Sequence, residues 1–133
     1  MSTRLGCKAI VWFVCLLGFP VLLSAENAEA IASTERLHKS LLRNPRPGTL
    51  FERFYDTWLE LGTREELTSF LESRTIEPES AGDFFLLAVM QLRFDELDEA
   101  RATIEQGLNV QNAARPRFWL AQIALQQRQP DLA

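Results

Sequence analysis

Histidine is the residue best suited to acid–base and metal chemistry, and this chain has a single one, His38. An acid–base system centred on histidine, or a metal site built from several imidazoles, is excluded or severely limited by that count. His38 lies between Arg36 and Lys39 in a segment with helical spacing. We therefore expect His38 to be a solvated surface residue.

Three pairs of adjacent carboxylates offer a second kind of chemistry, because paired acids can transfer protons or hold a metal ion. Each pair stands near the start of a predicted helix, where negative charge offsets the positive end of the helix dipole. We therefore interpret these acids as helix-stabilising charges: Glu65 and Glu66, Asp95 and Glu96, and Asp98 and Glu99.

Cysteine and glycine complete the search for reactive groups. Both cysteines, Cys7 and Cys15, lie within the first 25 residues, so the rest of the chain has no thiol nucleophile, disulfide or thiolate metal site. The six glycines are spread singly and form no phosphate-binding loop. The sequence thus predicts that the protein is not an enzyme and holds no cofactor and no metal.

The first 25 residues have the pattern of a secretory signal peptide. Arg4 and Lys8 precede an uncharged segment, residues 9–25, that contains an apolar run. A basic start, a short apolar core and small residues after it are typical of a signal peptide, whereas a membrane-spanning helix needs about 20 apolar residues. We expect cleavage after residue 25 or residue 30, and export to the periplasm or out of the cell. The alternative is an uncleaved leader that anchors the chain in a membrane through residues 9–25.

The remainder of the chain has the spacing of helices joined by short turns, which predicts an all-α fold. Apolar residues recur at intervals of three and four, and no segment alternates as a strand does. A break at residues 44–48, with two prolines and a glycine, ends a lead-in segment that spans residues 26–48. Gly62 ends the next helix, and Thr63 with Glu66 forms a capping box for the one after. Further helices are expected over residues 83–92, 97–108 and 116–127, with Pro130 beginning another.

The helices of residues 49–133 recur in pairs at a period near 33 residues. The residues that carry the period are Phe51, Phe54, Tyr55, Trp58, Leu67 and Leu71 in the first unit, Phe84, Leu87, Ala88, Gln91, Ala100 and Ile104 in the second, and Leu120, Ala121, Ala124 and Ala133 in the third. This pattern resembles the tetratricopeptide repeat family. The resemblance implies helix-turn-helix repeats stacked as a short α-solenoid, with the last repeat incomplete. An ordinary helical bundle is the alternative.

In the tetratricopeptide family the first helix of each unit lines a groove that holds a peptide or a partner helix. The resemblance therefore implies a partner-binding groove formed by Phe85, Val89, Arg93, Arg115, Phe118, Gln122 and Gln126. Arginines at its rim would suit an acidic or amphipathic segment. If the last unit is cut short, the apolar side of its first helix lacks a partner helix; that side includes Trp119, Leu120 and Ile123.

These observations lead to three hypotheses about function. The first is a non-catalytic scaffold outside the cytoplasm whose partner is a protein or a peptide. The second is the regulatory or substrate-presenting part of a larger enzyme that continues beyond Ala133. The third is a structural helical domain with no ligand. A nucleic-acid partner is not expected, because the net charge is −4 and the basic residues are scattered.

Overall fold

The computed structural model describes residues 21–128, and it describes the side chains of residues 27–128. This part of the chain consists of six helices without a strand: α2 (Val21–Arg43), α3 (Thr49–Leu61), α4 (Arg64–Ile76), α5 (Ala81–Arg93), α6 (Leu97–Val110) and α7 (Ala114–Arg128). The all-α prediction is confirmed for these residues. Most of the predicted signal peptide and the predicted helix from Pro130 lie outside them, while α2 runs through both expected cleavage points. No described helix has the length and apolar character needed to cross a membrane.

The turn between α3 and α4 has the local structure that its sequence predicts. The Thr63 side chain accepts a hydrogen bond from the Glu66 N–H at 3.2 Å, and the Glu66 carboxylate accepts one from the Thr63 N–H at 3.1 Å. This reciprocal capping box satisfies two backbone donors that a helix start leaves unpaired. Gly62 donates its N–H to the Trp58 carbonyl at 2.9 Å, which closes the last turn of α3.

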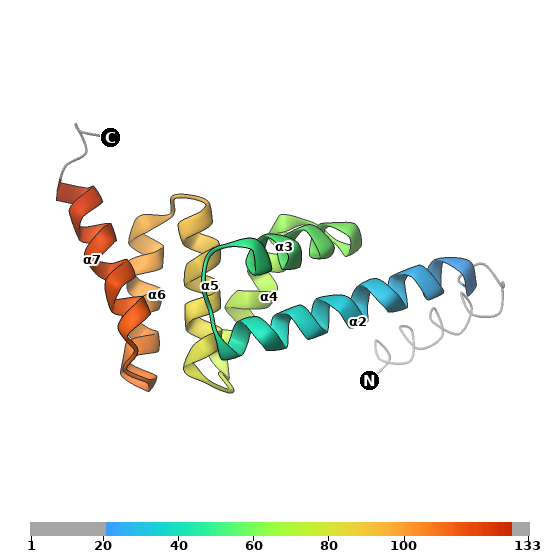
Figure 1. Cartoon of the computed structure of the whole chain (residues 1–133), viewed down its shortest axis with the longest axis horizontal. Coiled ribbons are helices and arrows are strands. Elements are labelled where there is room, and N and C mark those ends of the chain that lie inside the picture. The colour runs from blue at the N-terminus through green and yellow to red at the C-terminus, as the bar shows by residue number, and fades with distance from the viewer. Residues whose placement is uncertain (1–20, 129–133) are drawn as a thin grey trace, which may run out of the picture.

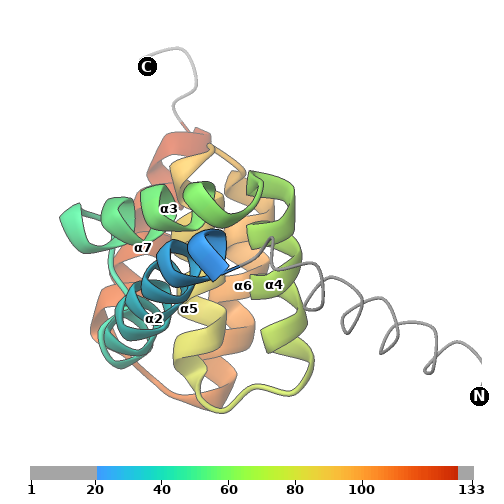
Figure 2. The ribbon, with the colours of Figure 1, turned by 90° about the vertical axis from the view of Figure 1, so that its right-hand side faces the viewer.

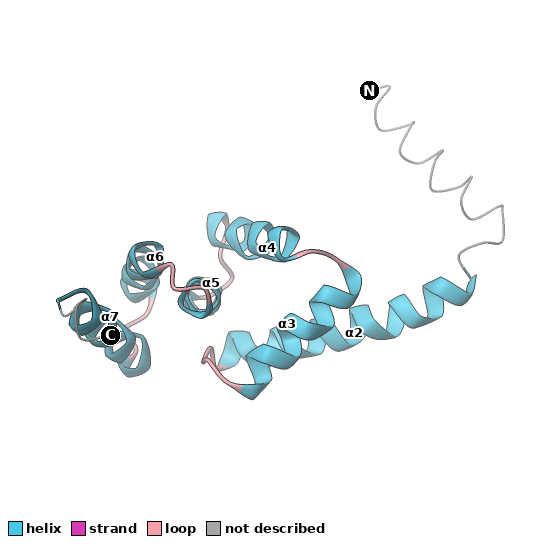
Figure 3. Cartoon of the chain, turned by 90° about the horizontal axis from the view of Figure 1, so that it is seen from above, coloured by secondary structure: helices cyan, strands magenta, loops and turns pink. Residues whose placement is uncertain are grey.

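The helices form two groups that cross each other. Helices α5, α6 and α7 stand in a row and run alternately up and down in Figure 1, whereas α2 and α3 lie across them as an antiparallel pair. Seen from the side, α4 joins the upright group (Figure 2), and from above α5 and α6 are viewed nearly end-on while α7 is tilted (Figure 3). The pairing differs from the expected repeat units, because α3 packs along α2 and not along α4. Only α5 and α6 form the extensive hairpin expected of a unit.

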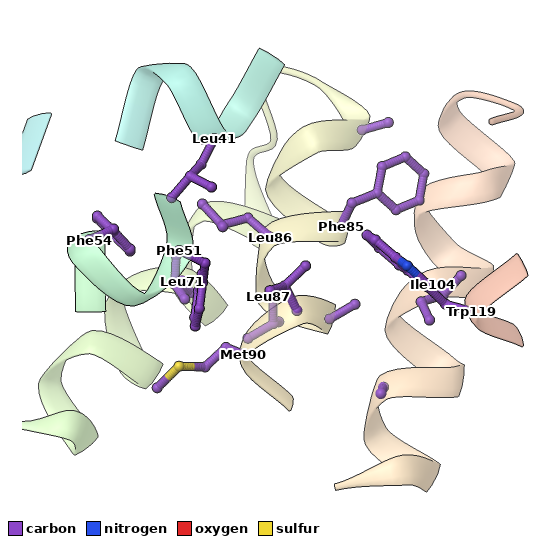
Figure 4. Packing of buried hydrophobic residues seen from close by; sticks show 14 of the residues in the cluster. Leu41, Phe51, Phe54, Leu71, Phe85, Leu86, Leu87, Met90, Ile104 and Trp119 are labelled. Carbon is purple, nitrogen blue, oxygen red and sulfur yellow. The ribbon is translucent and has the colours of Figure 1, made fainter. Parts of the chain in front are cut away.

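Helix α5 is the centre of the molecule. Every residue from Ala81 to Gln91 is buried, as expected for a helix that is apolar around its whole circumference. Helices α2, α4 and α6 each pack against it. Figure 4 shows Phe85 directed toward Ile104 and Trp119, while Met90 lies on the opposite side near Leu71. The core is therefore continuous through α5, from the α2–α3 pair to α7.

The start of α5 is held by a buried carboxylate. Asp83 is 2% exposed, and it accepts hydrogen bonds from the Glu79 N–H at 2.9 Å and from Arg74 Nε at 3.3 Å. A second nitrogen of the guanidinium, Nη2 of Arg74, lies 3.3 Å from the Glu79 carboxylate. A buried charge is tolerated when it is both paired and hydrogen-bonded. This cluster fixes the turn between α4 and α5.

Helices α5 and α6 approach closely at Gly107. A Cβ atom at this position would lie 2.9 Å from the Cβ of Phe84 and 2.9 Å from Cδ1 of Phe85. Glycine in the middle of a helix costs about 0.5–1 kcal/mol relative to alanine. Gly107 is therefore explained by the packing of α6 on α5 and not by helix propensity.

His38 is not the solvated residue that the sequence predicts. It is half-buried, and its Nε2 atom is buried without a hydrogen-bond partner among the described residues. Four aromatic rings from three helices form a closed cycle of contacts, which we call the aromatic quartet: His38, Phe54, Trp58 and Phe70. The distances between the centroids of neighbouring rings, taken in that order and back to His38, are 5.9, 6.4, 5.2 and 5.3 Å. The prediction failed because α3 and α4 both cover this face of α2. Ile31, two turns before His38 on the same helix, is 48% exposed.

We expect Gly107→Ala to destabilise the protein by about 1–2 kcal/mol, because overpacking against Phe84 and Phe85 outweighs the gain in helix propensity. Urea unfolding followed by circular dichroism measures this change. Gln106→Ala, on the exposed side of the same helix, is the matched control and should be neutral or slightly stabilising. Equal behaviour of the two variants would contradict the close approach of α5 and α6.

We expect the stability of the protein to depend on the protonation of His38. Burial lowers the pKa of His38 below its ordinary value of 6.5, and Arg74 lowers it further, against smaller opposing effects of Asp83 and Glu79. Below pH 6.5 the unfolded chain therefore binds more protons than the folded chain. As the pH falls, the free energy of unfolding decreases until the pH reaches the pKa that His38 has in the folded protein.

The free energy of unfolding, measured from about pH 7.5 to about pH 5.5, should decrease more steeply in the wild type than in His38→Leu. Charges on other residues titrate in both proteins, so the difference between the two curves isolates His38. Parallel curves would show that the imidazole is not desolvated in the folded state.

Candidate partner-binding site

The two predicted groove residues in the middle of α5 lie in the core. Phe85 is 5% exposed and Val89 is 1% exposed, because α5 is covered on all sides. Neither side chain is available as an open groove surface, which corrects the expectation from the family resemblance. Phe85 still borders a cavity at the start of α5.

Arg93, the third predicted groove residue on α5, is used within the protein. Its Nε donates a hydrogen bond to the Glu52 carboxylate at 2.7 Å, and this contact raises the pKa of Arg93 above its already high value. Arg93 is the last residue of α5, whereas Arg115 lies in the first turn of α7. Because α5 and α7 run in the same direction, the end of one helix and the start of the other lie at opposite edges of the molecule (Figure 1). The two arginines therefore do not share a groove.

The four predicted residues on α7 share one exposed side of that helix. At 100° per residue, Phe118 and Leu125 lie within about 20° of each other around the helix axis. Both are 61% exposed, and the glutamines at 122 and 126 are exposed beside them. We call this surface the α7 face: Arg115, Phe118, Gln122, Leu125 and Gln126. Leu125 was not predicted, although it lies seven residues after Phe118 and so on the same side.

The buried side of α7 differs from expectation. Trp119 is 5% exposed and Ile123 is 1% exposed, and both belong to the core cluster with α5 and α6. The residues expected to lack a partner helix are therefore covered, apart from half-buried Leu120. The large apolar side chains that the helix exposes are Phe118 and Leu125.

Arg115 joins the α7 face to a cavity of about 750 Å³. The cavity lies where the end of α2 meets the first turns of α5 and α7, and Phe85 and Pro116 contribute apolar wall. Three cationic side chains line it, so we call it the basic cavity: Lys39, Arg43 and Arg115.

No carboxylate of the described residues forms an ion pair with the three cationic side chains of the basic cavity. Lys39 and Arg43 are exposed and form no ion pair with a described carboxylate. Arg115 donates a hydrogen bond at 2.6 Å to the neutral amide oxygen of Asn44. The acidic lining residue, Glu79, is paired with Arg74. Lys39 and Arg43 are four residues apart on a helix, and this spacing places them side by side on its surface. The spacing signals a basic surface in the sequence, although no site was predicted there.

The acidic residues of the described part of the chain do not gather into a metal-binding group. No cluster of three histidine, cysteine, aspartate or glutamate residues within them has the arrangement of a metal site. The carboxylate pairs stand at helix starts, as expected: Glu66 caps α4, Asp98 and Glu99 lie in the first turn of α6, and Glu96 precedes that helix.

We expect Trp119→Ala to destabilise the protein by about 3–5 kcal/mol, because it removes a large buried side chain. Phe118→Ala, on the adjacent residue, should change the free energy of unfolding by no more than about 0.5 kcal/mol. Urea unfolding of both variants tests which side of α7 is buried. A larger loss for Phe118→Ala than for Trp119→Ala would mean that α7 packs with its other side.

Comparison of the sequence and structure with protein-family models, curated proteins and solved structures finds no match. Support for the candidate site therefore comes from the sequence and geometry of this chain alone.

Proposed function

We propose that this chain is an exported, non-catalytic protein-interaction module whose partner presents an acidic, partly apolar segment. The observation that carries the proposal is the basic cavity: three cationic side chains gather at one hollow in a chain whose net charge is −4. The first turns of α5 and α7 open onto the same hollow. The C-terminal ends of α2 and α6 line it as well, so the helix dipoles oppose one another and the attraction for negative charge comes from the three cationic side chains.

The α7 face supplies the apolar part of this surface. Phe118, about one turn from Arg115, and Leu125, two turns further along α7, offer exposed apolar side chains. Arg115 belongs to both the face and the cavity. A binding surface typically combines an apolar centre with a polar rim that fixes orientation. An acidic segment that lays carboxylates into the basic cavity would place its apolar residues along α7.

The helical hairpin of α5 and α6, with α7 beside it, is compatible with one and a half repeats of the tetratricopeptide type. Ala88 and Ala100 are both fully buried, and Gly107 permits the close contact of the two helices. Small residues at such contacts are what a stacked repeat requires. In this proposal α2 and α3 cover one end of the repeat array.

The location outside the cytoplasm is proposed from the N-terminal sequence. The basic start and the apolar run of the first 25 residues support export. A cysteine-free chain after the leader is consistent with a domain that is stabilised by packing alone.

The proposal predicts that a labelled peptide of alternating Glu and Leu residues binds the protein, as measured by fluorescence anisotropy. The matched peptide of Lys and Leu should not bind. The double variant Lys39→Glu and Arg115→Glu should weaken binding of the acidic peptide by roughly tenfold or more, which corresponds to about 1.4 kcal/mol. Binding should also weaken with added salt, because the cations are exposed.

The double variant Arg36→Glu and Arg117→Glu is the control for this experiment. It makes the same change of charge on the same two helices, α2 and α7, at exposed residues outside the basic cavity. Its affinity for the acidic peptide should stay close to that of the wild type. Equal loss in both variants would indicate a general effect of net charge, and binding of the basic peptide would refute the proposed partner chemistry.

A further inference from the structure

A second cavity, of about 500 Å³, lies between α2, α3 and α4. Three members of the aromatic quartet, His38, Trp58 and Phe70, are half-buried where they line it, and Phe54 lines it from a fully buried position. Ile31 and Leu61 add exposed apolar side chains to the lining. We call this the aromatic cavity. Its size and its largely aromatic walls are those of sites that bind small organic molecules.

The quartet makes the aromatic cavity a formed site and not a loose gap. Each ring of the quartet contacts two others, and the indole N–H of Trp58 donates a hydrogen bond to the Thr63 carbonyl at 3.2 Å. The capping box on Thr63 and Glu66 fixes the same turn. The aromatic walls are therefore held in place before any ligand arrives.

The aromatic cavity is lined by two acidic residues, Glu35 and Glu66, and by one permanently cationic residue, Arg74. Glu35 lies on α2 and forms no ion pair with another described residue, and Glu66 on α4 accepts only the neutral Thr63 N–H. The cationic lining residue, Arg74, is already paired with Asp83 and Glu79. Two carboxylates without a cationic partner thus stand beside exposed parts of aromatic rings.

We propose that the aromatic cavity binds a small organic cation, an ammonium group carried on an apolar body about the size of one aromatic ring. Trp and Phe faces attract cations through their ring quadrupole, with Trp the strongest. The carboxylates of Glu35 and Glu66 provide the matching charge. An anion would be repelled by both, and a neutral apolar molecule would desolvate them without giving a partner. The site is separate from the basic cavity, so this proposal does not depend on the proposed function.

The test uses the full chain, labelled with ¹⁵N, and phenethylammonium chloride as the probe. The indole signal of Trp58 and the amide signal of Gly62 report on the cavity in heteronuclear NMR spectra. We expect both to shift in a saturable way. Phenethyl alcohol has the same body without the charge, and at matched ionic strength it should bind roughly tenfold more weakly.

Variants separate this charge effect from apolar binding. Glu35→Gln removes one charge at a residue that makes no described hydrogen bond, and it should weaken binding of the ammonium probe by roughly threefold, as expected for a partly exposed pair. Glu105→Gln, an exposed acid on α6, is the matched control and should leave the affinity unchanged. Binding of the alcohol as tight as that of the ammonium, an unchanged affinity in Glu35→Gln, or no saturable shift of Trp58 would each overturn the proposal.

Discussion

The burial of α5 on every side is the constraint on which the rest of this structure depends. A helix that is apolar around its whole circumference must be covered by several neighbours. Here the α2–α3 pair, α4 and α6 provide that cover, and α7 completes the core on the far side of α6. The crossed arrangement of the two helix groups follows, because a single row of antiparallel helices would leave one side of α5 in water.

Two kinds of contact set the position of α5 within this cover. Small residues allow close approach: a Cβ on Gly82 would overlap the Leu42 carbonyl oxygen of α2, and one on Gly107 would overlap the Phe85 ring and the Phe84 Cβ of α5. A buried ionic contact sets direction, because Asp83 ties the start of α5 to Arg74 of α4. Apolar burial supplies most of the stabilisation. The glycines and the carboxylate select one packing among several of similar apolar area.

The same constraint moves the candidate binding surfaces to the periphery. Since Phe85 and Val89 are used in the core, the exposed chemistry lies around α2 and along α7. Helix α2 contributes to two hollows of opposite character. Its C-terminal end gives Lys39 and Arg43 to the basic cavity, and its middle gives Glu35 and His38 to the aromatic cavity. One helix thus separates a region suited to acidic ligands from one suited to cationic ligands.

The sequence by itself determined the helices and the breaks between them, although α2 begins at Val21 and not after the expected signal peptide. Gly62, the Thr63–Glu66 capping box and the proline-containing break at residues 44–48 act within one or two turns, so local chemistry is sufficient. For the candidate site, the family resemblance implied Arg115, Phe118, Gln122 and Gln126, and the structure places these four residues on one exposed side of α7. The sequence could not determine that α3 pairs with α2, that His38 is enclosed by Phe54 and Phe70, or that Trp119 is buried while Phe118 is exposed. Only the tertiary structure decided these points, since which face of a helix is covered depends on residues distant in sequence whose packing no local pattern records.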